Sequence, residues 1–174
     1  MNKIVLIGFR ATGKTTTGQK LAQVLKWKFI DLDEEIQKKA KKTIKEIVEE
    51  GGWEEFRKRE RELMREIADL KNVVIALGGG GVLHKEEMKK LKENSLVVWL
   101  KTSEKEIIKR MKKDQKTTSQ RPDLSNLPLE EEVKKILKER EPLYKIYSDL
   151  EIDTTNLSHD KVIEKILRQI LLVT

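Results

Sequence analysis

The sequence predicts an α/β fold in which a five-stranded parallel sheet is flanked by helices in three layers. Two observations lead to this prediction. Short apolar, β-rich runs alternate along the chain with longer stretches of helical periodicity, which is the pattern of parallel strands joined by crossover helices. A glycine-rich loop of a kind that binds phosphate joins the first run to the first helical stretch. With 174 residues and no linker-like stretch, the chain is expected to form a single domain over residues 1–174.

The predicted strands lie near residues 3–7, 28–31, 72–77, 95–100 and 149–153. The first contains the continuous apolar run from Ile4 to Ile7, as expected of a strand that is buried on both faces. A last helix is predicted near residues 158–172. Its apolar stripe includes Leu171, so we expect this residue to lie in the core.

Two segments between these elements are expected to serve binding rather than the core. The interval 33–70 is longer than one crossover helix requires, and Gly51 and Gly52 interrupt it. We therefore expect several helices there, forming a small substrate-binding lobe over about residues 33–60. The polar stretch over about residues 113–127 has no periodicity and is predicted to be a mobile lid that excludes water.

The glycine-rich loop satisfies the pattern G-x-x-x-x-G-K-[ST] from Gly8 to Thr15. Its glycines allow backbone N–H groups to turn toward phosphates, Lys14 can reach the β- and γ-phosphates, and the Thr15 hydroxyl can ligate Mg²⁺. Strand, loop and helix follow in the order that this P-loop motif requires. The loop residues predicted to bind ATP are Gly8, Ala11, Thr12, Gly13, Lys14, Thr15 and Thr16.

Two carboxylates, Asp31 and Asp33, end the second predicted strand. Residues two apart on a strand point the same way, and the carboxyl ends of an open parallel sheet face the ligand crevice. We therefore expect one to hold Mg²⁺ through water and the other to bind and polarise an acceptor hydroxyl. The alternative is that Asp33 only caps a helix that begins at Glu34.

Two predicted helices carry a charge inside their apolar stripe. Around residues 53–70, Glu60 lies within the apolar arc and Arg57 at its edge, so the buried carboxylate is expected to pair with Arg57. Around residues 129–147, Arg140 lies near the centre of the stripe. An inward-facing guanidinium needs a carboxylate, which is either an internal Asp or Glu or the carboxylate of a substrate.

Four glycines, Gly78 to Gly81, follow the third predicted strand. Glycine at the carboxyl end of a strand lets a ligand approach the main chain closely, so the run is predicted to form a wall of the substrate site. A flexible connector without function is the alternative.

Composition narrows the class of partner. The balance of 37 Lys and Arg against 30 Asp and Glu gives a net charge of +7, which suits a nucleic acid or an anionic small molecule. Charge alone does not decide between them. The basic stretch from Lys101 to Arg121 has no interleaved aromatic residues for stacking bases, so a solvated helix face is expected to account for most of its charge. The chain has no cysteine, a strand-like N-terminus and no apolar run of about 18 residues. We expect a cytoplasmic monomer without a nucleic-acid or membrane partner.

Seven short motifs in order resemble those of the shikimate kinases, a family of nucleoside-monophosphate-kinase-like P-loop proteins. The family pattern is G-K-[ST]-T, D-x-D, F-R-x-x-E, a triple glycine, R-P, R-x-P-L-Y and an adenine-contacting segment after the last strand. The corresponding residues here are Gly13-Lys14-Thr15-Thr16, Asp31-Leu32-Asp33, Phe56-Arg57-Lys58-Arg59-Glu60, Gly78-Gly79-Gly80, Arg121-Pro122, Arg140-Glu141-Pro142-Leu143-Tyr144 and Asp153-Thr154-Thr155-Asn156.

The resemblance implies a P-loop kinase that transfers a phosphoryl group from ATP to the 3-hydroxyl of shikimate, a step of aromatic amino-acid biosynthesis through chorismate. The products would be shikimate 3-phosphate and ADP. Lys14, Asp33 and Arg121 would be catalytic, and Mg²⁺ would be held by Thr15 and, through water, by Asp31.

The resemblance also implies which residues bind each substrate. Arg121 and Asn156 would contact ATP, and Glu60 would orient an arginine of the acceptor site. The residues implied to bind shikimate are Asp33, Arg57, Gly78, Gly79, Gly80 and Arg140.

The chain departs from the family at Asp123, which puts a charge where the R-P-L-L pattern of the lid has an apolar residue. Which basic residue meets the adenine also stays open among Arg110, Lys112 and Lys113. One rival function is a P-loop kinase of another small carboxylate-bearing polyol, such as gluconate. The other is a nucleic-acid-associated ATPase, although the chain has no N-K-x-D segment.

Overall fold

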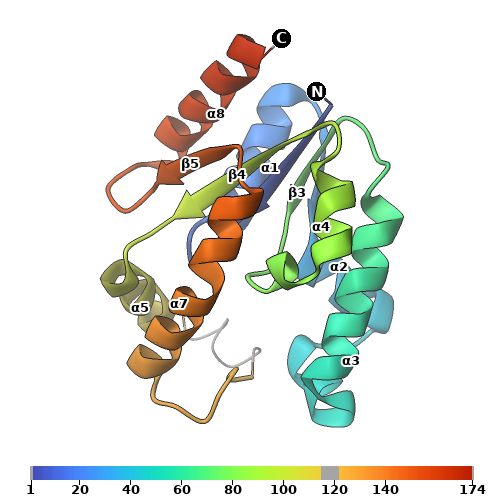
Figure 1. Cartoon of the computed structure of the whole chain (residues 1–174), viewed down its shortest axis with the longest axis vertical. Helices are drawn as coiled ribbons and strands as arrows, with labels where there is room; N and C mark the ends of the chain where they lie inside the picture. The colour runs from blue at the N-terminus through green and yellow to red at the C-terminus, as the bar shows by residue number, and fades with distance from the viewer. Residues whose placement is uncertain (1, 115–121, 174) are drawn as a thin grey trace.

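A computed structural model describes residues 2–114 and 122–173 (Figure 1). Its centre is a sheet of five parallel strands in the order β2-β3-β1-β4-β5. The strands are β1 (Lys3–Ile7), β2 (Lys28–Asp31), β3 (Val73–Ala76), β4 (Ser95–Lys101) and β5 (Leu150–Asp153). The predicted five-stranded parallel sheet is therefore confirmed, with strand ends within one residue of those expected.

Helices connect the strands and cover both faces of the sheet. They are α1 (Lys14–Leu25), α2 (Leu32–Ala40), α3 (Ile44–Ile67), the short 3₁₀ helix η1 (Gly81–Leu83), α4 (Lys85–Lys92), α5 (Glu104–Lys113), α7 (Leu129–Tyr147) and α8 (His159–Val173). Figure 1 shows α8 on one side of the sheet and α3, α4 and α7 on the other, which gives the three predicted layers.

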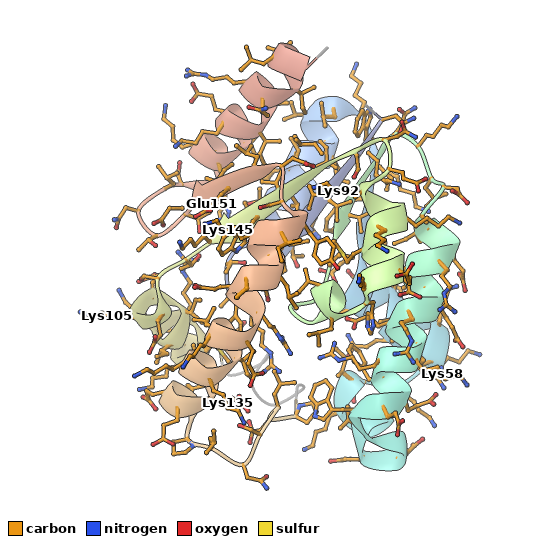
Figure 2. The ribbon with its side chains drawn as sticks, in the orientation of Figure 1. Lys58, Lys92, Lys105, Lys135, Lys145 and Glu151 are labelled. Carbon is orange, nitrogen blue, oxygen red and sulfur yellow. The ribbon has the colours of Figure 1, made fainter. Side chains whose placement is uncertain are left out.

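The two faces of β1 supply two separate cores, because successive strand residues point to opposite sides of a sheet. Ile4 and Leu6 pack with apolar residues of α1 and α8. Val5 and Ile7 pack with residues of α2, α3, α4 and α7. Long charged side chains lie outside these cores, such as Lys58 on α3 and Lys105 on α5 (Figure 2). The strand that leads into the P-loop is thus fixed from both sides.

The predicted interruption between residues 33 and 70 takes the form of a short α2 and a bent α3. A capping box starts α3, because the Thr43 hydroxyl accepts from the Glu46 N–H and the Glu46 carboxylate accepts from the Thr43 N–H. Gly52 breaks the helical geometry of α3 with φ 72° and ψ 176°. This left-handed φ suits glycine, so the bend is placed where the sequence permits it.

The last helix corrects one expectation. Val162, Ile163 and Ile166 of α8 are buried as the apolar stripe predicts. Leu171, expected in the core, is 77% exposed, since the helix extends past the edge of the sheet. No helix within residues 2–114 and 122–173 is both long enough and apolar enough to cross a membrane.

Candidate active site

The carboxyl ends of β1, β2 and β3 open into two adjoining chambers. The loop chamber has a volume of about 290 Å³ and lies over the P-loop. The arginine chamber, of about 30 Å³, lies between α3, α7 and the glycine run. Arg10, Asp33, Gly78 and Gly79 line both chambers. These four residues therefore mark the junction at which a group could pass from a ligand in one chamber to a ligand in the other.

The P-loop has the backbone geometry that its motif predicts. Gly13 has a left-handed φ of 87° and precedes α1, and a Cβ there would lie 2.9 Å from Cε1 of His159. Ala11 also has a left-handed φ, of 58°, which costs a residue with a side chain about 1 kcal/mol. Thr12 is buried and its hydroxyl donates to the Phe9 carbonyl at 2.9 Å. Thr16, with Lys14 and Thr15, lines the loop chamber.

Lys14 and Thr15 lie in the first turn of α1, where the positive end of the helix dipole favours anions. The Lys14 ammonium donates to the carbonyls of Gly8 at 2.7 Å and Phe9 at 2.6 Å, so it is held across the loop. The Thr15 hydroxyl donates to Oδ2 of Asp31 at 2.6 Å. A cation, a hydroxyl and a carboxylate thus meet beside the phosphate-binding turn.

The structure assigns different local roles to the two carboxylates after β2. Asp31 is the N-cap of α2, and its Oδ1 accepts from the Glu34 N–H at 3.1 Å. Asp33 lies in the first turn of α2 rather than on the strand, and it is 8% exposed. The alternative that Asp33 caps a helix beginning at Glu34 is wrong, because Leu32 already begins the helix. Asp33 instead faces the junction of the two chambers.

The predicted pairing of Glu60 and Arg57 is confirmed. Nη1 of Arg57 donates to Oε1 of Glu60 at 2.7 Å. His84 adds a second donor, since its Nε2 lies 2.7 Å from the same oxygen. Glu60 is fully buried. Burial alone would raise the pKa of Glu60, but the His84 hydrogen bond and the charge of Arg57 outweigh it and lower the pKa.

Arg140 of α7 is buried, with 7% exposure, and lies against the glycine run. Across the described ranges 2–114 and 122–173, no carboxylate forms an ion pair with it. Its pKa is lowered chiefly by burial, and the positive charge of Arg57 lowers it further. The internal partner that the sequence left open is thus not found among these residues, and two guanidinium groups face one small chamber.

The glycine run makes room for charged side chains of the arginine chamber. A Cβ on Gly78 would lie 2.6 Å from Oδ1 of Asp33, and a Cβ on Gly80 would overlap the guanidinium of Arg57. Gly79 lies near Arg140, with 3.3 Å between a built Cβ and Nη1. Gly78, Gly79 and Gly80 therefore line the arginine chamber, and the protein's own residues require the lack of side chains at Gly78 and Gly80.

Tyr144, one turn beyond Arg140 on α7, fixes this wall. Its hydroxyl donates to the Gly79 carbonyl at 2.6 Å, and its ring packs 5.7 Å from that of Trp99. Burial raises the pKa of Tyr144 to about 12, so the hydroxyl keeps its proton and stays a donor. One helix thus delivers a cation to the chamber and holds the opposite backbone in place.

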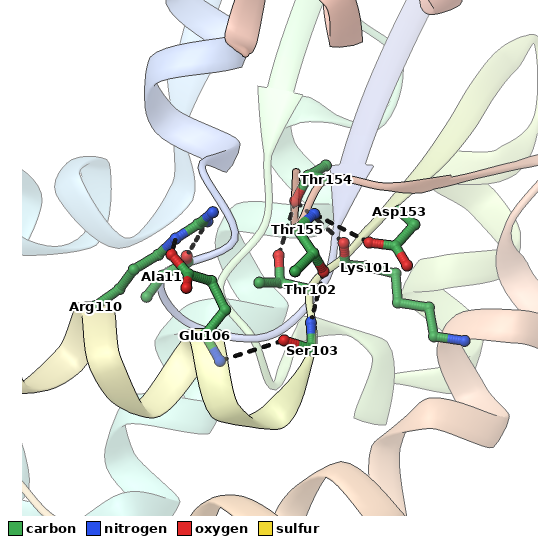
Figure 3. Close-up of polar contacts among 9 residues, drawn as sticks. All are labelled: Ala11, Lys101, Thr102, Ser103, Glu106, Arg110, Asp153, Thr154 and Thr155. Atoms are coloured by element: carbon green, nitrogen blue, oxygen red, sulfur yellow. Dashed lines mark hydrogen bonds and ion pairs between the residues drawn. The ribbon is translucent and has the colours of Figure 1, made fainter. Parts of the chain in front are cut away.

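On the other side of the P-loop, polar contacts tie the ends of β4 and β5 together (Figure 3). The hydroxyls of Thr102 and Thr154 lie 2.7 Å apart, and the Ser103 N–H donates to the Thr155 hydroxyl at 3.0 Å. The next residue, Asn156, is exposed in the same loop. These contacts fix a polar rim beside the phosphate-binding turn.

Of the three basic residues left open by the sequence, Arg110 of α5 contacts the P-loop. Its Nη1 donates to the Ala11 carbonyl at 2.9 Å, while its Nε pairs with Glu106 at 3.0 Å (Figure 3). Lys112 instead pairs with Glu130 of α7, and Lys113 is exposed. The guanidinium of Arg110 is therefore held at the edge of the loop chamber.

The predicted lid lies only partly within the described residues, and Arg121 lies outside them. Asp123 accepts a hydrogen bond through its backbone carbonyl from the indole of Trp53, at 3.3 Å. Leu124 lines the arginine chamber. Leu124 matches the last residue of the R-P-L-L pattern, whereas Asp123, the position of the departure, lines the loop chamber.

The family model for shikimate kinase matches residues 10–171. The chain belongs to the shikimate kinase family. A shikimate kinase from Pelotomaculum thermopropionicum is 42% identical over 167 residues, which make up 96% of this chain and 94% of that protein.

Solved structures agree with this family. A shikimate kinase from Acinetobacter baumannii in complex with shikimate matches with a TM-score of 0.90 at 32% identity, covering 100% of this chain and 95% of that one. A shikimate kinase from Aquifex aeolicus matches with a TM-score of 0.81 at 33% identity, covering 97% and 95%. The resemblance drawn from the sequence motifs is confirmed. As a member of the shikimate kinase family, this chain is a kinase.

Sequence reasoning missed two residues that line the chambers, Arg10 and Glu132, and one that contacts the arginine chamber only through Glu60, His84. Arg10 lines both chambers, yet its position in the P-loop pattern is a variable x. His84 has no periodic neighbour that would indicate a partner on α3. Glu132 of α7 is 4% exposed and accepts from the Ser125 N–H at 2.6 Å. Glu132 lies three residues after Leu129 and four before Ile136, so its spacing puts a charge inside the apolar stripe, as for Arg140.

Proposed function

We propose that this member of the shikimate kinase family transfers the γ-phosphoryl group of ATP to the 3-hydroxyl of shikimate. The observation that carries the proposal is the junction of the two chambers. The P-loop lies in the loop chamber. The guanidinium groups of Arg57 and Arg140 lie in the arginine chamber, and no carboxylate of the described residues bridges the two. Asp33 stands between the two chambers. A phosphate donor and a carboxylate-bearing alcohol would meet there.

The acceptor would be oriented by charge at one end and by hydrogen bonds at the other. Arg57 and Arg140 would hold its carboxylate through charge-assisted hydrogen bonds. Asp33 would accept hydrogen bonds from the ring hydroxyls and take the proton of the hydroxyl that attacks. Gly78, Gly79 and Gly80 would face the ring with backbone alone, as supported by their place in the lining of the arginine chamber.

The phosphates would bind to the P-loop backbone from Gly8 to Thr16. The turn at Gly13 and the start of α1 direct backbone N–H groups and the helix dipole to one place. Lys14 would exchange its carbonyl contacts for the β- and γ-phosphates and stabilise the charge that develops during transfer. Arg121, which lies outside the described residues, is proposed to add a second cation.

We propose that Mg²⁺ accompanies the nucleotide. The fit is supported by the donor set beside Lys14, which consists of the Thr15 hydroxyl and the Asp31 carboxylate, oxygen donors of the kind that Mg²⁺ prefers. Thr15 would bind it directly and Asp31 through water. When bound, the ion would neutralise phosphate charge. Thr15 and Asp31 already contact each other, so the protein holds these oxygens in place in advance.

The nucleotide base would lie between α5 and the loop after β5. Arg110 is the residue that we propose for the base, because its guanidinium is anchored on the Ala11 carbonyl at that edge. Asn156 would contact the base from the other side, supported by the fixed loop at Thr154 and Thr155. A monomer without a nucleic-acid partner and a location in the cytoplasm stay predictions.

The test is Mg²⁺-dependent release of ADP from ATP with shikimate, gluconate, a nucleoside monophosphate or single-stranded RNA offered separately. The proposal expects stimulation by shikimate and none by the other three. Turnover with gluconate alone would keep the fold and the phosphate chemistry but overturn the acceptor. Lys14→Ala serves as the control for contaminating ATPase, because it removes the phosphate-binding cation and leaves both cores untouched.

A further inference from the structure

Within residues 2–114 and 122–173, Arg57 makes one ion pair together with several other contacts. Its guanidinium lies 5.4 Å from the ring centroids of Trp53 and Phe56 and packs over Gly80. Glu60 supplies the charge partner at 2.7 Å. A guanidinium has five N–H donors, so one bond to Glu60 leaves donors for a ligand in the arginine chamber. The direction of Arg57 therefore depends on how Glu60 itself is held.

Glu60 is held through a single oxygen. Arg57 and His84 both bond Oε1, each at 2.7 Å. Oε2 is buried and has no hydrogen-bond partner among the described residues. A fully buried carboxylate with two donors is close to the minimum that keeps it ionised, because each missing donor costs part of its lost hydration. The loss of either donor should therefore change how strongly Glu60 binds the other.

His84 is placed for this contact by the backbone on both sides of it. It joins η1 to α4, its N–H donates to the Gly81 carbonyl at 3.2 Å, and its carbonyl accepts from the Met88 N–H at 2.9 Å. Although His84 is the N-cap residue of α4, its side chain makes no cap hydrogen bond there. The imidazole is turned to Glu60 of α3 instead and is buried, with 6% exposure for the residue.

We propose that His84 is a positioning residue for acceptor binding, which holds Glu60 so that Arg57 presents its guanidinium to the acceptor carboxylate. The inference rests on the proposed function. His84 does not line the arginine chamber, so it acts through Glu60 and Arg57. Without the N–H donor of His84, Glu60 would bind Arg57 more strongly or take up a proton. Either change weakens the hold of Arg57 on the acceptor carboxylate.

The test compares three variants by steady-state kinetics with shikimate and ATP varied in turn. His84→Leu removes the donor, and His84→Gln keeps an N–H near the position of Nε2. Met88→Ala is the packing control, since Met88 of α4 is fully buried in the core and lines neither chamber. His84→Leu should raise the KM for shikimate about tenfold and leave the KM for ATP within about twofold.

His84→Gln should restore most of the affinity for shikimate, whereas Met88→Ala should lower the melting temperature with the KM for shikimate unchanged. An equal rise of both KM values, no difference between His84→Leu and His84→Gln, or a rise with Met88→Ala as large as with His84→Leu would overturn the inference. If His84→Leu fails to fold, His84→Asn takes its place, because its amide is one methylene too short to reach Glu60.

Failure of the proposed function and failure of the role of His84 give different results. If the wild-type protein releases no ADP with shikimate, the proposed function fails, and the His84 variants are then compared on whichever acceptor of the panel is phosphorylated. If the wild-type protein uses shikimate and the variants match it, only the role of His84 fails.

Discussion

The two chambers are built in opposite ways. The loop chamber takes its main phosphate-binding groups from one continuous segment, Gly8 to Thr16, whose backbone supplies the donors. The arginine chamber is assembled from side chains of α2, α3 and α7 and from the backbone of the glycine run, which are far apart in the sequence. A continuous motif fixes its own geometry through local turns, whereas a dispersed one depends on tertiary packing.

The chambers also differ in what their charges cost. Lys14 donates to two carbonyls in a part-buried position and lies beside open volume. Glu60 and Arg140 are buried, and each depends on a neighbour to offset its lost hydration. Mutations in the loop chamber should therefore remove chemistry with little effect on stability. Mutations in the arginine chamber should affect acceptor affinity and, at buried partners, stability as well.

The largest effect should come from the loop chamber. Lys14→Ala should lower kcat by at least about 10³-fold, because it removes the cation that faces the transferred phosphoryl group. The melting temperature should stay within about 2 °C of wild type, since no core contact is lost. Steady-state kinetics and a thermal melt check both parts. A variant that is unfolded, or one that retains most of its activity, would contradict the claim that loop-chamber residues serve chemistry rather than stability.

The next effect should be confined to the arginine chamber. Arg140→Ala should raise the KM for shikimate about 50-fold, as expected when one partner of a charge-assisted contact is lost, with the KM for ATP within about twofold. Varying each substrate in turn measures this split. Arg140→Lys is the matched control that keeps the charge but loses the fork of donors, and it should fall between wild type and alanine. Equal effects on both substrates would count against the carboxylate role.

A smaller effect is expected where α7 holds the glycine wall. Tyr144→Phe deletes the hydroxyl that donates to the Gly79 carbonyl and leaves that carbonyl without this donor. The loss of one buried hydrogen bond should cost about 1 kcal/mol, which lowers the melting temperature by about 2–4 °C in a chain of this size. The ring contact with Trp99 is retained. An unchanged melting temperature and KM for shikimate would show that the wall does not need this bond.

The smallest effect concerns pH at the rim of the loop chamber. Burial, with the charges of Lys20 and Arg110, lowers the pKa of His159, whose Nδ1 lies 3.0 Å from the Thr17 hydroxyl. A histidine with a lowered pKa in the folded state binds its proton more readily when unfolded, so stability falls as the pH drops through about 6.5.

His159→Gln carries no such proton. Between pH 7.5 and 5.5 its melting temperature should fall less than that of wild type, by a difference on the order of 1 °C because the site is partly solvated. Parallel melting curves for the two proteins across this range would contradict the assignment.

The contrast between the chambers also explains what the sequence predicted. The P-loop and the sheet follow from local patterns, a glycine motif after an apolar run and repeated strand–helix alternation. The Arg57–Glu60 pair could also be predicted from the sequence, because residues three apart on a helix are neighbours. The spacing placed Arg140 inside α7 as well, but only the folded chain shows which groups surround it.

Tertiary contacts account for the rest. Tyr144 fits an apolar stripe like any core aromatic residue, and nothing in its spacing indicates that its hydroxyl reaches Gly79. His84 pairs with a residue 24 positions away on another element. Leu171 continues a regular stripe, but the helix outruns the sheet that would cover it. Asp33 was expected at the end of a strand, but α2 begins one residue before it and places it in the first helical turn.

The most direct measurement is kcat/KM for shikimate and for its methyl ester, in wild type and in Arg140→Ala. Esterification removes the carboxylate charge and leaves the reacting hydroxyl intact. If the arginine chamber recognises that carboxylate, the ester should be about 100-fold worse than shikimate for wild type and only a few-fold worse for Arg140→Ala. The same penalty in both proteins would contradict a carboxylate clamp at Arg140 and, with it, the division of labour between the two chambers.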